Sequence, residues 1–183
     1  MSARSLGQDI LSAMPPPETY GPTTPTIIST KVAQKLTSYI LANTKLMGIY
    51  NGVIPGTPPI PEVSIPDTWS VVGNIAPAVT SSAGPNVWLM QLDNNIRIGI
   101  LTASGSYCNP MSLVPAFPAI STMLQQSEIA AYGNKSSSVA TDIWELVLTR
   151  IFTAIKMGFI PTVPAMSNAG GTGVFTITSV ILN

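Results

Sequence analysis

The sequence has no histidine and very few charged residues. Only 9% of its residues are charged, against about 25% in an average soluble domain, and eight basic residues balance eight acidic ones. Without histidine, a Ser–His catalytic triad and the usual zinc sites are excluded. Because there is no basic patch to follow a phosphate backbone, nucleic acid is not expected to be the main partner.

Cysteine is almost absent as well. The single Cys108 excludes an internal disulfide and any metal cluster built from cysteines. Its neighbours Ser106, Tyr107, Asn109 and Pro110 include no base that could activate a thiolate. We therefore expect an inert thiol, buried or in a loop, in a chain made in a reducing cytoplasm.

Long uninterrupted apolar segments are missing too, although the chain is apolar overall. The longest stretch without charge, residues 98–127, contains Pro110, Pro115 and Pro118, so we expect no membrane span there. Gln8 and Asp9 interrupt the apolar stretch that a signal peptide would need. With 45% hydrophobic residues and a mean hydropathy of +0.37, the chain is expected to cover part of its surface with other protein.

The N-terminal region is predicted to form a helix followed by an extended arm. Residues 1–14 predict a short helix, which Ser2 or Ser5 would cap. Residues 15–26 are rich in proline and threonine and predict an extended arm without ladder hydrogen bonds. We therefore divide the chain into a helix and arm over 1–28 and a single α+β domain over 29–183.

The domain is expected to combine helices with a small sheet. Helices are predicted at about 29–47, 118–131 and 138–157, and the last is apolar around nearly its whole circumference. The clearest strand pattern is a hairpin of Val87–Leu92 and Ile96–Leu101 around Asp93-Asn94-Asn95. Shorter strands are expected at Val63–Ile65 and Trp69–Val72, a loop at 102–117 and a final strand at Val174–Leu182. The predicted fold is α+β, with a small antiparallel sheet packed on two or three helices and an extended Pro/Thr-rich N-terminal arm.

A weak internal repeat relates residues 29–61 to residues 136–167. In both segments a helix precedes a Gly-Φ-Ile-Pro sequence, where Φ is apolar, at Gly52–Pro55 and at Gly158–Pro161. Two repeats would suit a pseudo-twofold core; alternatively, any helix that ends before a proline loop gives this pattern.

Carboxylates, serines and glycines offer few candidates for chemistry. Asp142 and Glu145 could form an acid–base pair, but both fall in the first turns of a helix, where acidic residues favour the helix dipole. Glu62 and Asp67 are expected in a solvated loop, and the cations Lys31, Lys35 and Lys45 on the solvated face of one helix. Three short segments resemble known motifs but lack residues that those motifs require. These are Ser104-Gly105-Ser106 as a nucleophile elbow, Gly170-Gly171-Thr172-Gly173 as a phosphate-binding loop and Asp93-Asn94-Asn95 as a calcium loop. We predict no catalytic, cofactor-binding or metal-binding residues, and we expect Trp69, Trp88 and Trp144 to anchor the core or an interface.

Over its full length the chain resembles small virion structural proteins of tailed bacteriophages. The resemblance lies in the N-terminal helix and proline-threonine arm, the low charge, the absence of histidine and near absence of cysteine, and the glycine-rich entry into the last strand at Gly170–Ile177. It implies many copies in symmetric positions and function by contact, and it carries over no functional residue.

The expected function is therefore structural, without an enzyme activity or cofactor. We expect a subunit of a phage tail or baseplate, assembled in the host cytoplasm, whose partners are other virion proteins and copies of itself rather than nucleic acid, membrane or a small molecule. A capsid decoration or head-completion (neck) protein is the alternative. A virion-associated wall-degrading enzyme is more remote; it would need a cleft with carboxylates from among Glu62, Glu128, Asp142 and Glu145.

Overall fold

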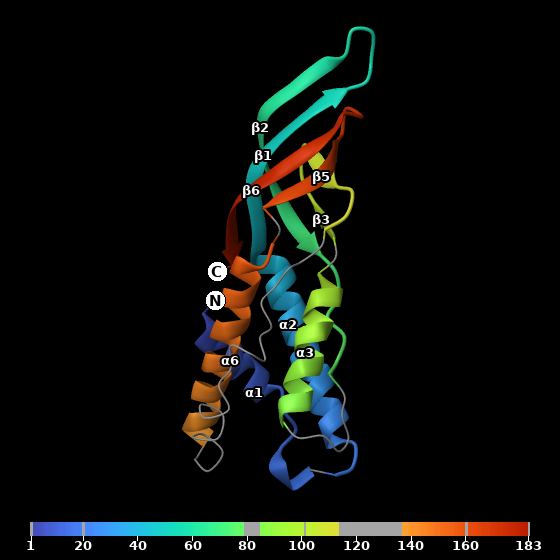
Figure 1. Cartoon of the computed structure of the whole chain (residues 1–183). Coiled ribbons are helices and arrows are strands. Elements are labelled where there is room, and N and C mark those ends of the chain that lie inside the picture. Colours follow the sequence, from blue (N-terminus) through green and yellow to red (C-terminus); the bar gives the residue numbers. More distant parts are fainter. Residues whose placement is uncertain are drawn as a thin grey trace.

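The structure is a computed structural model that describes residues 2–19, 21–78, 85–100, 102–113, 137–159 and 161–182. α-Helices gather at one end of an elongated molecule, and a six-stranded antiparallel sheet forms the other end (Figure 1). We call these ends the helical half and the β half. The predicted α+β class is confirmed, while the helices stack below one end of the sheet (Figure 1).

The N-terminal helix is part of the fold. Helix α1 (Ala3–Ser12) begins with a capping box, in which Ser5 N–H donates to Ser2 Oγ at 3.2 Å and Ser2 N–H donates to Ser5 Oγ at 2.9 Å. The helix buries Leu6 and Ile10 and packs on the C-terminal helix α6 (Ser137–Met157). The prediction of an extended arm over 15–26 is wrong, because that segment contains a 3₁₀ turn (Pro17–Thr19) and the first residues of the next helix. A proline in the first turn, Pro25, favours that helix start.

A helix and a strand follow each other without a loop. Helix α2 (Thr24–Asn43) ends where the Asn43 side chain donates to the Tyr39 carbonyl at 2.7 Å, and Thr44 already has extended backbone. Strand β1 (Thr44–Ile54) starts at that residue. The helix predicted at 29–47 therefore exists with earlier bounds, and its last residues belong to the sheet.

The sheet nearly closes into a barrel. Its order is β3-β2-β1-β6-β5-β4, and the two outermost strands contact each other. The central hairpin joins β1 to the long β2 (Ile60–Val72), which absorbs both short strands predicted in this region. The other strands are β3 (Thr102–Ser104), β4 (Cys108–Pro110), β5 (Thr162–Ser167) and β6 (Thr172–Leu182). The predicted last strand is thus confirmed as β6.

The predicted hairpin at 87–101 is wrong, because most of it forms helix α3 (Pro85–Gly99). Leu92, Ile96 and Ile100 are buried four residues apart, as one face of a helix requires, whereas Ile98 is 57% exposed. In the predicted strand, Ile98 would have shared a buried face with Ile96 and Ile100. The helical period therefore prevails over the β propensity of the isoleucines.

One hydrophobic core runs through both halves. In the β half, Trp69 stacks on Phe175 with ring centroids 4.0 Å apart, and both side chains are fully buried. In the helical half, Tyr39 of α2 stacks on Phe152 of α6 with centroids 5.1 Å apart. Because the core is continuous, the described part of the chain forms one domain.

The two segments of the suggested repeat do not occupy equivalent places. Gly52 and Pro55 lie at and beyond the far end of β1, whereas Gly158 follows α6 directly and Pro161 precedes β5. This difference argues against a structural repeat. The helix expected at 118–131 lies outside the described residues.

Candidate functional site

The most unusual surface of the protein is the outer face of its sheet. Along β1, Leu46 and Tyr50 are fully buried, while Met47, Ile49 and Val53 point outward and are 41, 38 and 45% exposed. Side chains of a strand alternate between the two faces of its sheet, and an outward face in water is normally polar. Here large apolar side chains occupy the outward positions.

The strand register extends this face over β2, β1, β6 and β5. Neighbouring strands place apolar or small polar side chains side by side in rows, because antiparallel partners face the same way. From the hairpin end, the rows are Pro61–Val53–Thr172–Met166, Asn51–Val174–Pro164, Pro66–Ile49–Thr176–Thr162 and Thr68–Met47–Ser179. We call these residues, together with the 67%-exposed Val63 of β2, the outer sheet face.

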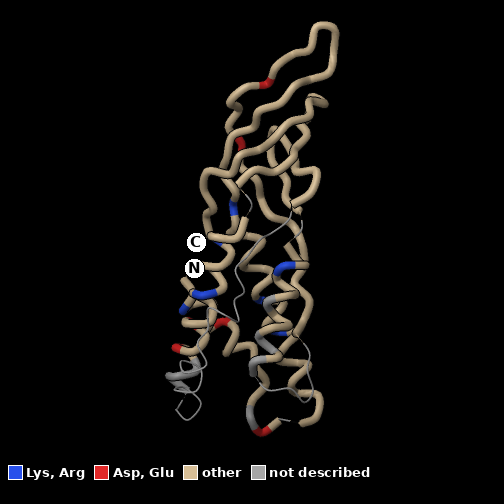
Figure 2. The backbone as a smooth tube through the Cα atoms, in the orientation of Figure 1, with Lys and Arg blue, Asp and Glu red and all other residues tan. Residues whose placement is uncertain are grey.

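The outer sheet face carries no charge. Figure 2 shows that charged residues are sparse over the whole β half. Among the described residues of that half, the charged ones are Lys45, Glu62 and Asp67, and both acids are buried. Lys45 lies where the sheet meets the helices and donates to Ser70 Oγ at 2.7 Å. The described surface of the β half is therefore close to neutral.

A shallow hollow shapes the outer sheet face. It has a volume of about 390 Å³, and its lining combines apolar and polar residues: Met47, Gly48, Ile49, Pro66, Asp67, Thr68, Ser106 and Thr178. An apolar surface with a depression can receive a protruding side chain of another protein, and large exposed apolar patches mark interaction sites. The geometry thus suits contact with protein better than contact with water.

The free edge of the sheet is poorly suited to binding another strand. Beyond its short pairing with β3, strand β2 has a described neighbour on one side only, at Ile60–Asp67. Pro61 and Pro66 have no N–H to donate there, and the Thr68 N–H donates to Asp67 Oδ1 at 2.9 Å. Strand β6 pairs with β1 along its length and with β5 at Thr172–Thr176, so this part of β6 has no free edge. Association is therefore expected through the face.

Glu62 of β2 is buried and connects this strand to β5 and to the segment between β3 and β4. It was expected in a solvated loop, but it is 5% exposed and accepts hydrogen bonds from the Tyr107 hydroxyl and from Ser167 Oγ, the latter at 3.0 Å. The hydrogen bond to Glu62 raises the pKa of Tyr107 to about 12. A Cβ atom at Gly171 would overlap the Glu62 carboxylate, so glycine is needed at that position. These groups satisfy one another's hydrogen-bonding capacity, and we interpret them as a structural cluster.

Asp67 holds the β3–β4 connection against β2. Its carboxylate accepts hydrogen bonds from Ser106 Oγ at 2.7 Å and from the backbone N–H groups of Ser106, Tyr107 and Cys108 at 3.2, 3.0 and 2.9 Å. Burial alone would raise its pKa, but the hydrogen bonds from Cys108, Ser106, Tyr107 and Thr68 outweigh burial and lower it. The solvated loop predicted for Asp67 is wrong, because these donors compensate for its burial.

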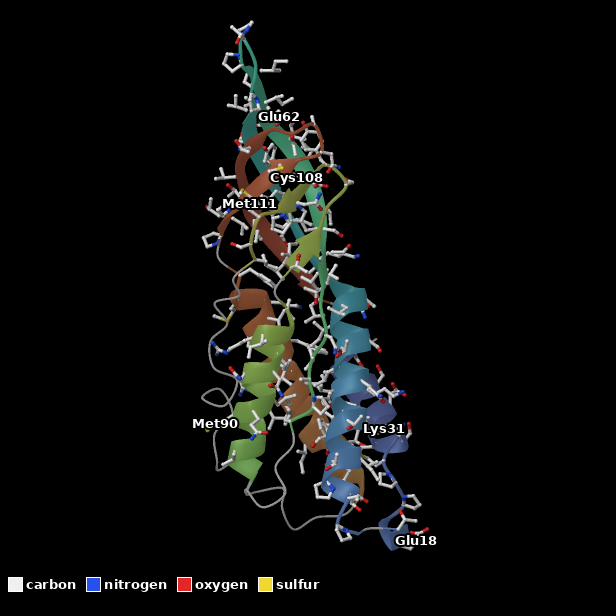
Figure 3. All side chains as sticks on the ribbon, turned by 90° about the vertical axis from the view of Figure 1, so that its right-hand side faces the viewer. Glu18, Lys31, Glu62, Met90, Cys108 and Met111 are labelled. Carbon is white, nitrogen blue, oxygen red and sulfur yellow. The ribbon has the colours of Figure 1, made fainter. Side chains whose placement is uncertain are left out.

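Cys108 is a buried free thiol, as predicted. Burial raises its pKa to about 11, so almost no thiolate is present near neutral pH. Figure 3 places it in the β half together with Glu62, far from Lys31 and Glu18 of the helical half. A thiol in this state has little reactivity as a nucleophile.

We expect Cys108 to react with DTNB only after unfolding. The folded chain should release no thionitrobenzoate over an hour at pH 8, and one equivalent in urea, because the chain has a single cysteine. A Ser179→Cys variant provides the control, since Ser179 lies on the exposed side of β6 and the new thiol should react within minutes. Rapid reaction of the folded wild-type chain would contradict the burial of Cys108.

The remaining candidates for chemistry have structural partners. Asp142 and Glu145 both bind Arg4 of α1, at 3.0 and 2.7 Å. They therefore join two helices at a surface, where about half of each side chain is exposed. Lys31 and Lys35 lie on α2 as predicted, but Lys45 lies on β1, so the three cations do not share one helix face. Glu128 and the side chain of Trp88 lie outside the described part of the chain.

Sequence reasoning missed the outer sheet face. The signal was present in Met47–Val53, where Met47, Ile49 and Val53 fall at positions of the same parity and Gly48, Tyr50 and Gly52 at the other. Because both sets are apolar or small, the pattern resembled the end of an amphipathic helix. The burial of Glu62 and Asp67 could not be inferred, since their partners come from distant strands.

Comparison with known protein families, characterised proteins and solved structures finds no match for the chain. In the described residues, histidine, cysteine and acidic side chains form no group of three that could hold a metal ion. None of the described helices combines the length and apolar character needed to cross a membrane.

Proposed function

We propose that the protein is a structural subunit of a bacteriophage virion, in the tail or baseplate, which acts by contact with other subunits in a symmetric assembly. The observation that carries the proposal is the outer sheet face, where large apolar side chains from several strands are exposed around a shallow hollow. The resemblance to small virion proteins in composition and order of segments suggests the kind of assembly. The partners proposed are other virion proteins and copies of the chain itself.

The energetics of the outer sheet face favour a protein partner. Removing apolar surface from water contributes about 25 cal/mol per Å². The carboxylate that lines the hollow, Asp67, is already buried and hydrogen-bonded within the chain, so its desolvation adds little cost when a partner covers the face. Its threonine, serine and asparagine side chains can form hydrogen bonds across an interface without a charged partner. The face can therefore form a specific contact that depends weakly on salt.

The polar groups inside the barrel give no support to an enzyme. Glu62 and Asp67 are held by hydrogen bonds within the chain, and the Arg4 guanidinium joins Asp142 to Glu145. A glycosidase needs two carboxyl groups that flank an open cleft. The four carboxylates named here instead form hydrogen bonds and ion pairs that hold elements of the chain together.

A lysine on the outer sheet face is expected to abolish association. Ile49→Lys should weaken co-assembly with the neighbouring gene products at least tenfold, because a buried ammonium without a partner is strongly unfavourable. Ile49 is 38% exposed, so the lysine can remain in water in the isolated subunit, which should fold normally. Native mass spectrometry of the chain, expressed alone and with its genomic neighbours, measures the effect.

Ile27→Lys is the matched control, since Ile27 lies on α2 and is 42% exposed. It should leave co-assembly unchanged. Normal assembly of Ile49→Lys would eliminate the outer sheet face as the contact, and a chain that stays monomeric with all its neighbours would contradict the proposed function. Mass spectrometry of separated heads and tails then tests location: presence in heads alone would favour the capsid decoration or neck alternative.

A further inference from the structure

Helix α1 is a terminal element that is held in place by distant parts of the chain. Leu6 and Ile10 are 1 and 0% exposed, and a Cβ at Gly7 would lie 3.0 Å from Trp144 Cβ, so α1 and α6 are in close contact. Arg4 binds the α6 carboxylates, and Asp9 binds Lys35 Nζ of α2 at 2.9 Å. This docking surface therefore combines an apolar centre with ion pairs at its rim.

The connection from α1 to α2 is mostly exposed and locally bonded. Pro16, Glu18 and the residues 21–23 are exposed. The hydrogen bonds that fold this connection join close neighbours: Thr19 N–H and Oγ1–H donate to the Pro16 carbonyl at 2.9 and 2.7 Å, and Gly21 N–H donates to Thr24 Oγ1 at 2.7 Å. Opening this segment would therefore leave the docking surface itself intact.

We propose that α1 is exchanged between neighbouring copies: the α2–α6 surface that receives α1 binds the α1 of a second copy with the same contacts. Fully extended, residues 13–23 would span roughly 35 Å, and the run Pro15-Pro16-Pro17 favours an extended backbone. Exchange of an identical element is a low-cost route to association, since every contact formed between copies already exists within one.

The balance between the closed and exchanged forms depends on effective concentration. The connection keeps α1 close to its own docking surface, at an effective concentration that is in the millimolar range for short flexible linkers. In an assembly of many copies, the docking surface of a neighbour is present at a comparable concentration. The exchanged form thus becomes populated wherever copies are concentrated, both in the assembly and in a concentrated preparation of the chain alone, and it links the copies into one unit. This inference goes beyond the proposed function, because it applies to any assembly of this chain.

The ion pair between Asp9 and Lys35 allows a direct test. A water-soluble carbodiimide joins an exposed carboxylate to an adjacent amine as an amide, and these two side chains are 40 and 36% exposed. The Asp9→Asn chain retains Lys35, and the Lys35→Gln chain retains Asp9. When the two chains are co-expressed with different tags, the amide between residues 9 and 35 can form only between copies.

We expect a covalent heterodimer in the co-expressed sample, with the linkage between Asp9 and Lys35 identified by peptide mass spectrometry. Each variant alone should give no such linkage. A second measurement needs no substitution: wild-type chains labelled with ¹⁴N and ¹⁵N are refolded together and cross-linked. Exchange predicts peptide pairs of mixed label, approaching half of all Asp9–Lys35 pairs. If the linkage joins only peptides of the same label and the heterodimer is absent, exchange is excluded.

The prolines of the connection provide an independent variant. Replacing Pro15, Pro16 and Pro17 with glycine should reduce the mixed-label fraction several-fold, because a flexible connection can turn back easily. Pro55→Gly with Pro59→Gly in the β1–β2 loop is the matched control and should leave that fraction unchanged. An unchanged fraction in the Pro15–Pro17 variant would contradict the role given to the connection. Failure of exchange would leave the Ile49→Lys result unaffected, so the two proposals are tested separately.

Discussion

Replacing Asp67 with asparagine is expected to lower the free energy of unfolding by about 3 kcal/mol. The carboxylate is buried and accepts hydrogen bonds from Ser106, Tyr107 and Cys108, and hydrogen bonds to a charged group contribute about 1.5–3 kcal/mol each. Asparagine keeps one oxygen but directs an NH₂ group at N–H donors. Urea denaturation followed by far-ultraviolet circular dichroism measures the loss.

The effect of Asp67→Asn should depend on pH. The folded-state pKa of Asp67 is below its ordinary value of 3.8, so the carboxylate stabilises the fold fully above that value. The stabilisation is lost as the pH falls below about 4 and through the lower folded-state pKa. The difference between wild type and variant should therefore be constant from pH 5 to 8 and should decrease at pH 3.

The Asp142→Asn variant is the control for Asp67→Asn. Asp142 also accepts a charged hydrogen bond, but its side chain is 47% exposed, and exposed ion pairs contribute about 0–1 kcal/mol. Equal losses for the two variants would mean that Asp67 is accessible to water, contrary to its position between β2 and the β3–β4 connection.

Trp69→Ala is expected to destabilise the protein by about 3–5 kcal/mol, the range found for large aromatic side chains in well-packed cores. Trp69 is fully buried and stacks on Phe175 across the inside of the barrel. Its removal leaves a cavity that the surrounding strands cannot fill, because they are fixed by their ladders. Urea denaturation gives the change in unfolding free energy.

Two further substitutions set the scale for Trp69→Ala. Trp69→Phe keeps an aromatic ring against Phe175 and should cost clearly less. Trp144→Ala removes a half-buried indole from α6 and should also have a smaller effect. A loss at position 69 no greater than that at position 144 would show that the barrel interior is not the tightly packed part of the molecule.

Several elements could be predicted because local signals agreed with the tertiary structure. Ser2 is a good helix cap, and Leu6 and Ile10 follow it at helical spacing, so α1 is readable from a few residues. Helix α6 is long and apolar on several sides, which matches its position between α1 and the core. The glycine-rich start of β6 likewise marked the last strand.

Other elements depended on information that is not local. The segment that forms α3 contains tryptophan and isoleucines with strong β propensity, and only burial of Leu92, Ile96 and Ile100 on one face selects the helix. Proline spacing suggested an arm at 15–26, although a proline also suits the first turn of a helix.

The existence of an interaction surface could be predicted from the sequence, but its location could not. Low charge and high hydropathy indicated a surface covered by protein, but they did not say which surface. The location follows from strand register, which brings Ile49, Val174 and Met166 together from distant parts of the chain. Register is set by pairing over the whole sheet, so no short window of sequence contains it.

The direct passage from α2 into β1 gives the molecule a mechanical property. Helix and strand follow each other without a loop, with about 30 Å of helix and about 35 Å of strand along the chain. Between its flanking strands, β1 is fastened on both sides. A pull on the hairpin tip along β1 would move β1 and β2 together and load the β1–β6 ladder in shear, so that many hydrogen bonds share the force instead of opening one at a time. We therefore expect the β half to resist tension applied at the hairpin tip along β1.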